Sequence, residues 1–364
     1  MKRLPIETLH SFMIEVFTRI GVPAEDAGIC ADILIASDLR GIESHGIGRL
    51  KMYYDRIKKG IQNPVTKIDV IRDKHATAVW DGNHGMGHVI GFRAMSEAIR
   101  KASQYGLGAV AVRNSTHYGI CGYYADMACR QNMLGLTFTN ARPSICPTHG
   151  VEPLLGTNPI CFGAPTDLPY PFIYDAATSI TQRGKIEQYA REEKDTPPAW
   201  AIDLEGRAQT DTPKLLVDLV KQTASLLPIG GTDEITGSHK GYGLSTMVEI
   251  LCSALQQGAY LNQLLGRDAS GKAEPYKLGH FFLAINIDFF TEIDDFKRTT
   301  GAICRELQNS RRFPGQDRIW VAGEKEYEKE QEVREQGVPI IPNLQRDIEF
   351  MVKDLGLDIS SLGL

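Results

Sequence analysis

The chain has 364 residues, of which 42% are hydrophobic and 23% charged, with a formal net charge of −5. This length is enough for about two domains, and the composition is ordinary for a globular protein in water. An acidic balance without basic blocks argues against a nucleic-acid partner. No apolar run approaches the roughly 20 residues that cross a bilayer, so we expect no membrane segment.

The seven cysteines are scattered along the chain, and none are spaced as Cys-x-x-Cys. This pattern suits a reducing compartment and argues against a disulfide framework or a zinc site. Residues 1–7 carry positive charges without an apolar core behind them, which is unlike a secretion signal. We therefore expect a cytoplasmic protein without a bound metal.

The chain opens with helices. Apolar residues recur at helical spacing over residues 6–20, Pro23 begins a second helix that runs to about residue 39, and a third helix covers 50–57. These helices are predicted to form a small unit that ends near Pro64.

From Val65 the pattern changes to a mixture of strands and helices. Residues 141–166 are rich in proline and glycine and are predicted to be loops that line a site, and 191–213 are expected to be irregular. Helices are predicted at 90–104, at 123–128 and at 245–257 after an opening at 240–244. Apolar and β-branched runs predict strands at 67–71, 76–80, 108–112, 135–140, 172–174 and 281–287.

The last part of the chain returns to helix. Residues 323–336 alternate charges at four-residue spacing, as on a solvated helix, and 344–355 form an amphipathic one. The order of helices, mixed α/β and helices suggests that the two chain ends pack together around an inserted domain. We expect a helical domain of residues 1–72 with 304–364, and an α/β cofactor-binding domain of 73–303.

Residues 76–112 look like the strand–helix–strand unit of a dinucleotide-binding domain, but the match is weak. The Gly-x-Gly of the turn is followed by glycine only at Gly91, and the second strand ends at Arg113 instead of an acidic residue. His84 and His88 have the spacing of metal ligands on a helix. They lie on a glycine-rich turn, where that spacing has no meaning.

His117 follows an apolar strand at 109–112 and precedes the helix at 123–128, so it lies on a polar turn. Loops on a rigid scaffold often carry catalytic groups, and histidine exchanges protons near neutral pH. The alternative is that His117 merely caps the helix. Its position alone leaves both open.

Six segments of the chain carry motifs that match one family in the family's order. They are residues 37–46, 114–119, 155–159, 175–179, 239–243 and, more weakly, 279–285. The family that they resemble is the malate/L-lactate dehydrogenase-like oxidoreductases, which also includes ureidoglycolate and sulfolactate dehydrogenases and a piperidine-2-carboxylate reductase. The resemblance implies NAD(P)-dependent oxidation of a 2-hydroxy acid, a homodimer with its site near the subunit contact, and a non-Rossmann fold. In that fold a mixed, mainly antiparallel α/β cofactor domain is inserted in a helical domain made from both chain ends.

The resemblance assigns His117 as the general acid/base, and His45 and Arg49 as residues of the substrate pocket. A guanidinium can hold a carboxylate with two hydrogen bonds. Arg49 could instead cap a helix or pair with a surface acid. Tyr53, one turn further along, could donate a hydrogen bond to the substrate or pack in the core.

A substrate with two carboxylates needs a second cation, and Arg142 is the candidate. The malate-oxidising members look more like this sequence at that position, which favours malate over lactate. The competing assignment is that Arg142 contacts the cofactor.

The cofactor is expected to be NAD or NADP, with NAD preferred. The segment Asp175, Ala176 and Ala177 matches the nucleotide-contacting turn of the family. Lys240, just ahead of a helix, matches its cofactor-binding lysine, although it could be an ordinary surface lysine. Thr157 and Asn158 could satisfy nicotinamide or phosphate groups.

The sequence therefore predicts a dehydrogenase that oxidises malate to oxaloacetate. A sibling activity on L-lactate, sulfolactate, ureidoglycolate or a cyclic imino acid is the alternative. More distant alternatives are a non-catalytic binding protein that kept the fold, and a metal-dependent hydrolase that uses the histidines.

Overall fold

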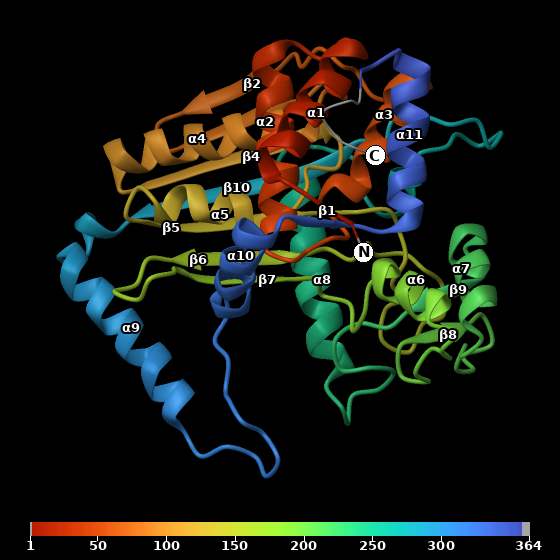
Figure 1. Cartoon of the computed structure of the whole chain (residues 1–364). Helices are drawn as coiled ribbons and strands as arrows, with labels where there is room; N and C mark the ends of the chain where they lie inside the picture. The colour runs from red at the N-terminus through yellow and green to blue at the C-terminus, as the bar shows by residue number, and fades with distance from the viewer. Residues whose placement is uncertain (1, 359–364) are drawn as a thin grey trace.

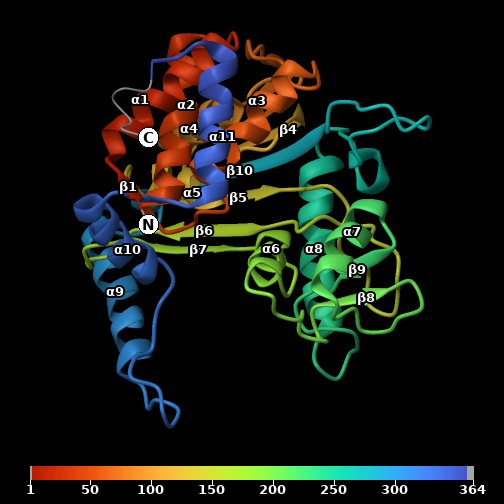
Figure 2. The same ribbon diagram turned by 45° about the vertical axis from the view of Figure 1, so that its right-hand side comes forward.

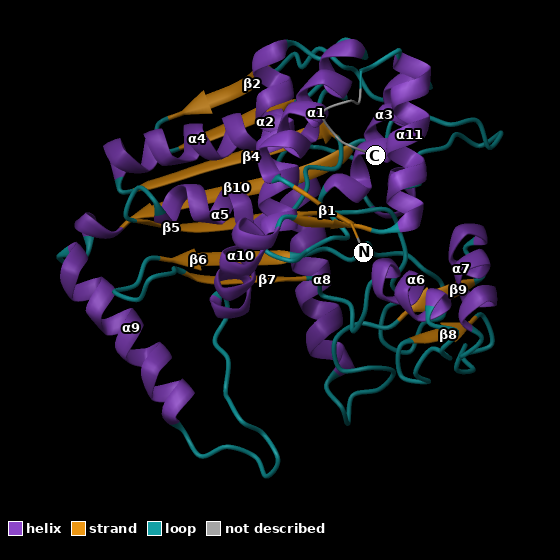
Figure 3. Cartoon of the chain, in the orientation of Figure 1, coloured by secondary structure: helices purple, strands orange, loops and turns teal. Residues whose placement is uncertain are grey.

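The computed structural model describes residues 2–358, which form eleven α-helices and three β-sheets. Figure 1 shows one large sheet with helices on both sides, and Figure 3 separates its strands from the helices around them. No helix in this part of the chain is long and apolar enough to cross a bilayer. All seven cysteines are free and buried.

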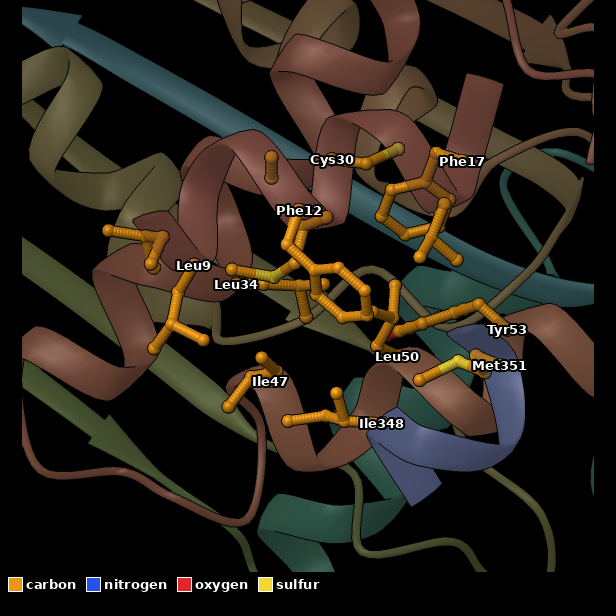
Figure 4. Close-up of a cluster of buried hydrophobic side chains, with 14 of the residues drawn as sticks. Leu9, Phe12, Phe17, Cys30, Leu34, Ile47, Leu50, Tyr53, Ile348 and Met351 are labelled. Carbon is orange, nitrogen blue, oxygen red and sulfur yellow. The ribbon is translucent and has the colours of Figure 1, made fainter. Parts of the chain in front are cut away.

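The predicted N-terminal helices are present as α1 (Ile6–Arg19), α2 (Ala24–Leu39) and α3 (Leu50–Lys58). Their apolar faces share one core with α11 (Pro342–Leu355) from the other end of the chain. Figure 4 shows this core, in which Ile348 and Met351 of α11 join Leu9, Phe17 and Tyr53.

The two chain ends also pair through their backbones, because β1 (Lys2–Leu4) runs antiparallel to β11 (Val338–Ile340). The predicted packing of one end against the other is therefore confirmed. The division into two domains with boundaries at 72/73 and 303/304 stays a proposal. Its second boundary falls inside α9 (Ile293–Asn309).

The large sheet has seven strands within the described residues, and only β3 and β4 run parallel. Every other neighbouring pair is antiparallel, which confirms the mixed, mainly antiparallel, non-Rossmann sheet. In spatial order the strands are β2 (Asp69–Lys74), β3 (Thr77–Asp81), β4 (Leu107–Ser115), β10 (Leu278–Asn286), β5 (Met133–Thr139), β6 (Ile160–Ala164) and β7 (Phe172–Ala176).

Different helices cover the two faces of this sheet. Successive residues of a strand point to opposite faces, and on β10 Phe282 packs with α4 (Gly87–Tyr105) and α5 (Cys121–Cys129). Its neighbour Phe281 packs against the cluster that includes Val248 of α8 (Ser238–Ser253). The sheet thus separates α8 from the helices that carry the chain ends.

The strand–helix–strand unit β3–α4–β4 forms, but other parts of the protein pack against its glycine-rich turn and bond its backbone N–H groups. The backbone N–H groups of Gly82 and His84 donate to the carbonyls of Arg113 and Asn114. A Cβ at Gly87 would clash with the backbone of the segment that carries His117. The glycines therefore bring this turn against the His117 loop, and their backbone is not free to cradle a phosphate.

A small lobe lies beside the sheet, at the lower right of Figure 2. The sequence predicted most of it as irregular and missed its elements. They are α6 (Arg183–Arg191), β8 (Ala201–Asp203), α7 (Thr212–Lys221) and β9 (Ala224–Leu226). On the other side of the molecule, α9 leads through a long loop to α10 (Glu324–Gln336), the predicted charged helix.

Candidate active site

A cleft of about 490 Å³ opens at the end of the sheet where β4, β5 and β10 meet the loops. Its walls come from the loop after α2, the β4–α5 loop, the ends of β5 and β7, and the start of α6. Of the predicted site residues, the cleft is lined by His45, His117, Thr157, Asp175, Ala176 and Ala177.

His117 lies on the loop between β4 and α5, as predicted. Its Nδ1 atom is 2.5 Å from the hydroxyl oxygen of Tyr53 on α3 and accepts the Gly119 N–H at 3.4 Å. No side chain caps α5, so the capping alternative is wrong. Within residues 2–358 no hydrogen bond engages Nε2, which leaves that nitrogen for a molecule in the cleft.

Tyr53 is completely buried and packs in the core, whereas a hydrogen bond from it to the substrate stays a prediction. Its ring belongs to the helical core and packs edge-on against His88, with ring centroids 4.6 Å apart. Its hydroxyl contacts His117 instead of lining the cleft. A phenol can donate or accept, so it can bond either tautomer of the histidine.

His45 lies over His117, with ring centroids 5.4 Å apart and nearly parallel planes. Its Nδ1 atom is 2.9 Å from the Ser44 hydroxyl. The loop that carries it is held from beneath by Asp38 of α2, whose carboxylate accepts the Ile47 N–H at 2.8 Å. Asp38 is nearly fully buried, and burial raises its pKa to about 8.

The site keeps its histidines neutral. Burial lowers the pKa of His117 well below its ordinary value, and the positive charges of Arg56 and Arg49 act in the same direction. Burial and Arg49 lower the pKa of His45 to about 4. At neutral pH, His117 is therefore ready to accept a proton.

Arg49 has none of the alternative partners considered for it. Its Nε donates to the Ser44 carbonyl at 2.5 Å, and within the described chain it makes no ion pair with an acid and no side-chain cap on α3. It lies close enough to both histidines to lower their pKa values, but it is not among the residues that line the cleft. Its assignment to the substrate stays a prediction.

The turn at the end of β7 forms the opposite wall. Asp175 accepts the Gly122 N–H at 2.7 Å, and burial raises its pKa to about 6 against the opposing effects of that N–H and of Arg40. Ser179, on the same wall, has a buried hydroxyl for which residues 2–358 supply no partner. An unsatisfied buried hydroxyl fits a site that holds a polar ligand.

A second cavity, of about 440 Å³, shares Ile42, Ile120 and Asp175 with the cleft and extends toward α10. It is lined in part by Gly323, at the start of that helix. The two cavities therefore lie side by side around these shared residues.

Thr157 lines the cleft, but the side chain of Asn158 does not. Its Nδ2 donates to Glu249 Oε2 at 2.8 Å and to the Ser245 carbonyl at 3.0 Å, while its Oδ1 accepts the Ala141 N–H at 3.2 Å. Asn158 is thus occupied by protein partners, and a direct role in cofactor binding stays a prediction.

Two predicted residues are not brought to the cleft. Arg142 donates to the Val220 carbonyl at 3.1 Å in the small lobe, although its neighbour Ala141 lines the cleft. Lys240 is exposed in the first turn of α8 and does not line the cleft. Contacts of either residue with substrate or cofactor stay predictions.

Sequence reasoning missed the part of the cleft contributed by the start of α6. Lys185 is a cation on this wall, beside Thr181 and Gln182. The helical spacing of Ile186 and Ala190 just after the Asp175–Thr178 turn could have revealed this short helix. Within residues 2–358, no group of three or more His, Cys, Asp and Glu side chains is arranged to hold a metal ion.

Comparisons with known proteins agree with this geometry. Residues 4–349 match the family model described as malate/L-lactate dehydrogenase. The chain is 43% identical over 356 residues to malate dehydrogenase from Pyrococcus horikoshii, covering 98% of this chain and 96% of that protein. It is 38% identical over 356 residues to L-sulfolactate dehydrogenase from Methanocaldococcus jannaschii, covering 97% of each. The crystal structure of malate dehydrogenase from Entamoeba histolytica matches with a TM-score of 0.95 and 44% identity, over 99% of both chains.

Proposed function

The chain belongs to the malate/L-lactate dehydrogenase family, which acts on 2-hydroxy acids, and we propose that it oxidises malate to oxaloacetate with NAD. The observation that carries the proposal is the contact between His117 and Tyr53 at the cleft wall. It leaves one ring nitrogen for the substrate and gives the other a buried partner.

In the proposed reaction, the neutral ring of His117 carries its proton on Nδ1, where it is donated to the Tyr53 oxygen, and Nε2 takes the proton of the substrate hydroxyl. The imidazolium then donates from Nδ1 to the Tyr53 oxygen, which stabilises the new charge. His45 covers one face of the ring and shields it from water. The oxidised nicotinamide, when bound, accepts the hydrogen of C2 with its electron pair.

Positive charge near the base supports a substrate with two carboxylates. Arg49 and Arg56 both act on the pKa of His117, so a dianion would gain attraction from both. Arg142 stays the sequence candidate for the second carboxylate, and it would have to leave the Val220 carbonyl to reach the cleft. L-Sulfolactate is also a dianion, and one similar protein is named for that activity.

The second cavity favours NAD over NADP. Its two arginines, Arg40 and Arg130, are both bonded to Asp126. Its wall also contains the carboxylates of Asp175, Glu326 and Glu330. Within residues 2–358 this cavity therefore offers no unpaired cation to a 2′-phosphate, which would also meet repulsion from the acids.

Turnover measurements with the purified protein test the proposal. Malate, L-lactate, sulfolactate and ureidoglycolate should each be offered with NAD and with NADP, and the cyclic imino acid with the reduced cofactors, while the absorbance of the reduced cofactor is followed. We expect the highest kcat/KM for malate with NAD. The proposal fails if no 2-hydroxy acid is oxidised, and the choice of malate fails if another substrate is preferred.

His117→Ala tests the assignment of the base. We expect turnover to fall by about 10²-fold or more, because general base catalysis contributes that much, while reduced cofactor still binds. Retained turnover would remove His117 from the role.

We also propose a homodimer and a cytoplasmic location. Support for the dimer comes from α8, whose outer face exposes large apolar side chains that a second copy could cover. Light scattering should give twice the chain mass, and Ile250→Glu should weaken the association. Support for the location comes from the free, buried cysteines. The exposed apolar residues of this face are Leu244, Met247 and Ile250 of α8, with Leu255 just after the helix.

A further inference from the structure

Behind the cleft, α8 buries a carboxylate that the proposed reaction does not use. Glu249 is 5% exposed and forms no ion pair within the described residues. It is held by N–H donors alone: the Asn158 Nδ2 at 2.8 Å, the Leu261 backbone N–H at 3.0 Å and the Asn140 Nδ2 at 3.4 Å. A buried charge without a counter-ion is costly unless hydrogen bonds stabilise it, so this arrangement calls for a role.

The two asparagines are oriented so that only an acceptor fits between them. Asn140 uses Oδ1 to accept the Gly279 N–H at 2.8 Å, and Asn158 uses Oδ1 to accept the Ala141 N–H. Each side-chain NH₂ group must then point toward Glu249. A glutamine at 249 would turn an NH₂ group of its own against one of these donors.

This carboxylate fixes residues that line the cleft. Asn140 lines it directly at the end of β5, and Asn158 lies between Thr157 and Pro159, which both line it. Asn140 also reaches β10, because Gly279 precedes His280 and follows the cleft residue Leu278. One side chain of α8 thus holds two segments of the cleft wall from behind and reaches a third, on β10, through Asn140.

We propose that Glu249 is a positioning residue. Through Asn140 and Asn158 it holds the backbone of the adjoining cleft wall in the position that the nicotinamide cofactor requires. The inference rests on the proposed function, since it concerns the same cleft. It assigns to Asn158 an indirect role in place of the direct contact expected from the sequence. Glu249 itself touches neither substrate nor cofactor.

Glu249→Gln in the full-length protein tests this, with NADH binding followed by fluorescence. We expect the Kd for NADH and the KM for NAD to rise by about 10-fold, while kcat at saturating NAD stays within threefold. In the absence of cofactor, the Leu261 amide should exchange its hydrogen faster than in the wild type, because a single amide oxygen must then serve donors that two carboxylate oxygens served.

Ser253→Ala is the matched control. Ser253 is buried one turn further along α8, and its hydroxyl bonds only the backbone carbonyl of Glu249. We expect this variant to bind NADH like the wild type. Equal weakening in both variants would mean that α8 packing is responsible and would overturn the inference.

If Glu249→Gln does not fold, Glu249→Asp replaces it. The shorter carboxylate stays an acceptor but retracts from both asparagines, so the Kd for NADH should still rise. A Kd within twofold of the wild type in either variant overturns the inference and leaves the proposed function intact. If the wild type itself binds neither NADH nor NADPH, the proposed function fails and the inference fails with it.

Discussion

Single side chains decide what this site can do. His117 comes from a sheet loop and Tyr53 from a helix of the N-terminal unit, and they are 64 positions apart in sequence. Because Tyr53 is completely buried, water cannot replace its hydroxyl if it is removed. The hydrogen bonding of His117 Nδ1 therefore depends on a residue that does not line the cleft.

Tyr53→Phe should lower kcat by about 10-fold or more, because Nδ1 loses the acceptor that stabilises the charged ring. NADH affinity should change by less than twofold. Tyr54→Phe is the control, since that neighbour bonds Asp354 on the other side of α3 and not His117. Steady-state rates that match the wild type in Tyr53→Phe would contradict the proposed role.

The buried His88 should make the protein sensitive to acid. Burial lowers its pKa from 6.5 to about 3, and neither ring nitrogen has a partner among the described residues. The unfolded chain binds the proton more tightly, so stability is complete above pH 6.5 and is lost as the pH falls toward 3. From pH 8 to pH 5 this single group should cost about 2 kcal/mol of unfolding free energy.

His88→Phe should remove that contribution. Urea unfolding of both proteins at pH 8 and pH 5 measures it: the loss on acidification should be smaller in the variant by about 2 kcal/mol. Equal losses in the two proteins would show that His88 is not the group responsible.

At the scale of elements, the site depends on close contacts between segments. The loop after α2 passes over the buried Asp38, and only a glycine fits at position 46, where a Cβ would collide with that carboxylate. This contact fixes the backbone that presents His45 above His117. The geometry of the histidine pair is thus set by a glycine and an aspartate outside the cleft.

Gly46→Ala should displace this loop and reduce kcat/KM by about 10-fold or more, since a misplacement of about 1 Å at a site can cost that much. Gly28→Ala is the control, because nothing lies within 4 Å of a Cβ there and alanine favours helix α2. A fully active Gly46→Ala enzyme would show that the His45 loop is not critical.

The sequence predicts elements well where the pattern is local. Regular apolar spacing identified α1, α2, α4 and most strands of the large sheet. Strand β6 was missed because its residues 160–164 lie in the proline- and glycine-rich stretch and include a cysteine and a glycine. Helix α9 was missed although its spacing is amphipathic. It packs little against the rest of the molecule, since only Gly301 and Cys304 are buried on it.

The site was predictable in identity but not in arrangement. The motif around His117 identified a histidine that lines the cleft, yet no local pattern could show that Tyr53 contacts it or that Asn158 turns away toward Glu249. Those contacts depend on how α3 and α8 dock on the sheet. Arg142 illustrates the reverse, since its charge suggested a substrate contact and its side chain lies in the small lobe.

At the scale of the whole molecule, the same hydrophobic core stabilises the fold and holds Tyr53 against His117. The helical core that buries Tyr53 also contains Ile348 of α11, from the opposite end of the chain. Figure 4 shows these side chains in one cluster. Damage at the C-terminal end should therefore reach the N-terminal helices, which carry Tyr53 and lead into the His45 loop.

Ile348→Ala should lower the free energy of unfolding by about 2–5 kcal/mol, because it leaves a cavity in this core. Ile303→Ala on α9 is the control, since that side chain is 55% exposed and should cost much less. Urea unfolding measures both. Equal losses would mean that α11 contributes no more to stability than the exposed helix.

The pairing of β1 with β11 has a consequence for synthesis of the protein. The first three helices are synthesised before residues 338–357, which complete their core. Domains usually fold in the order of synthesis. Here the N-terminal helices can complete their core only after α11 has been synthesised. Tyr53 acquires its final surroundings only then. A chain that stops short of α11 should therefore lack the ordered contact between Tyr53 and His117, the proposed base.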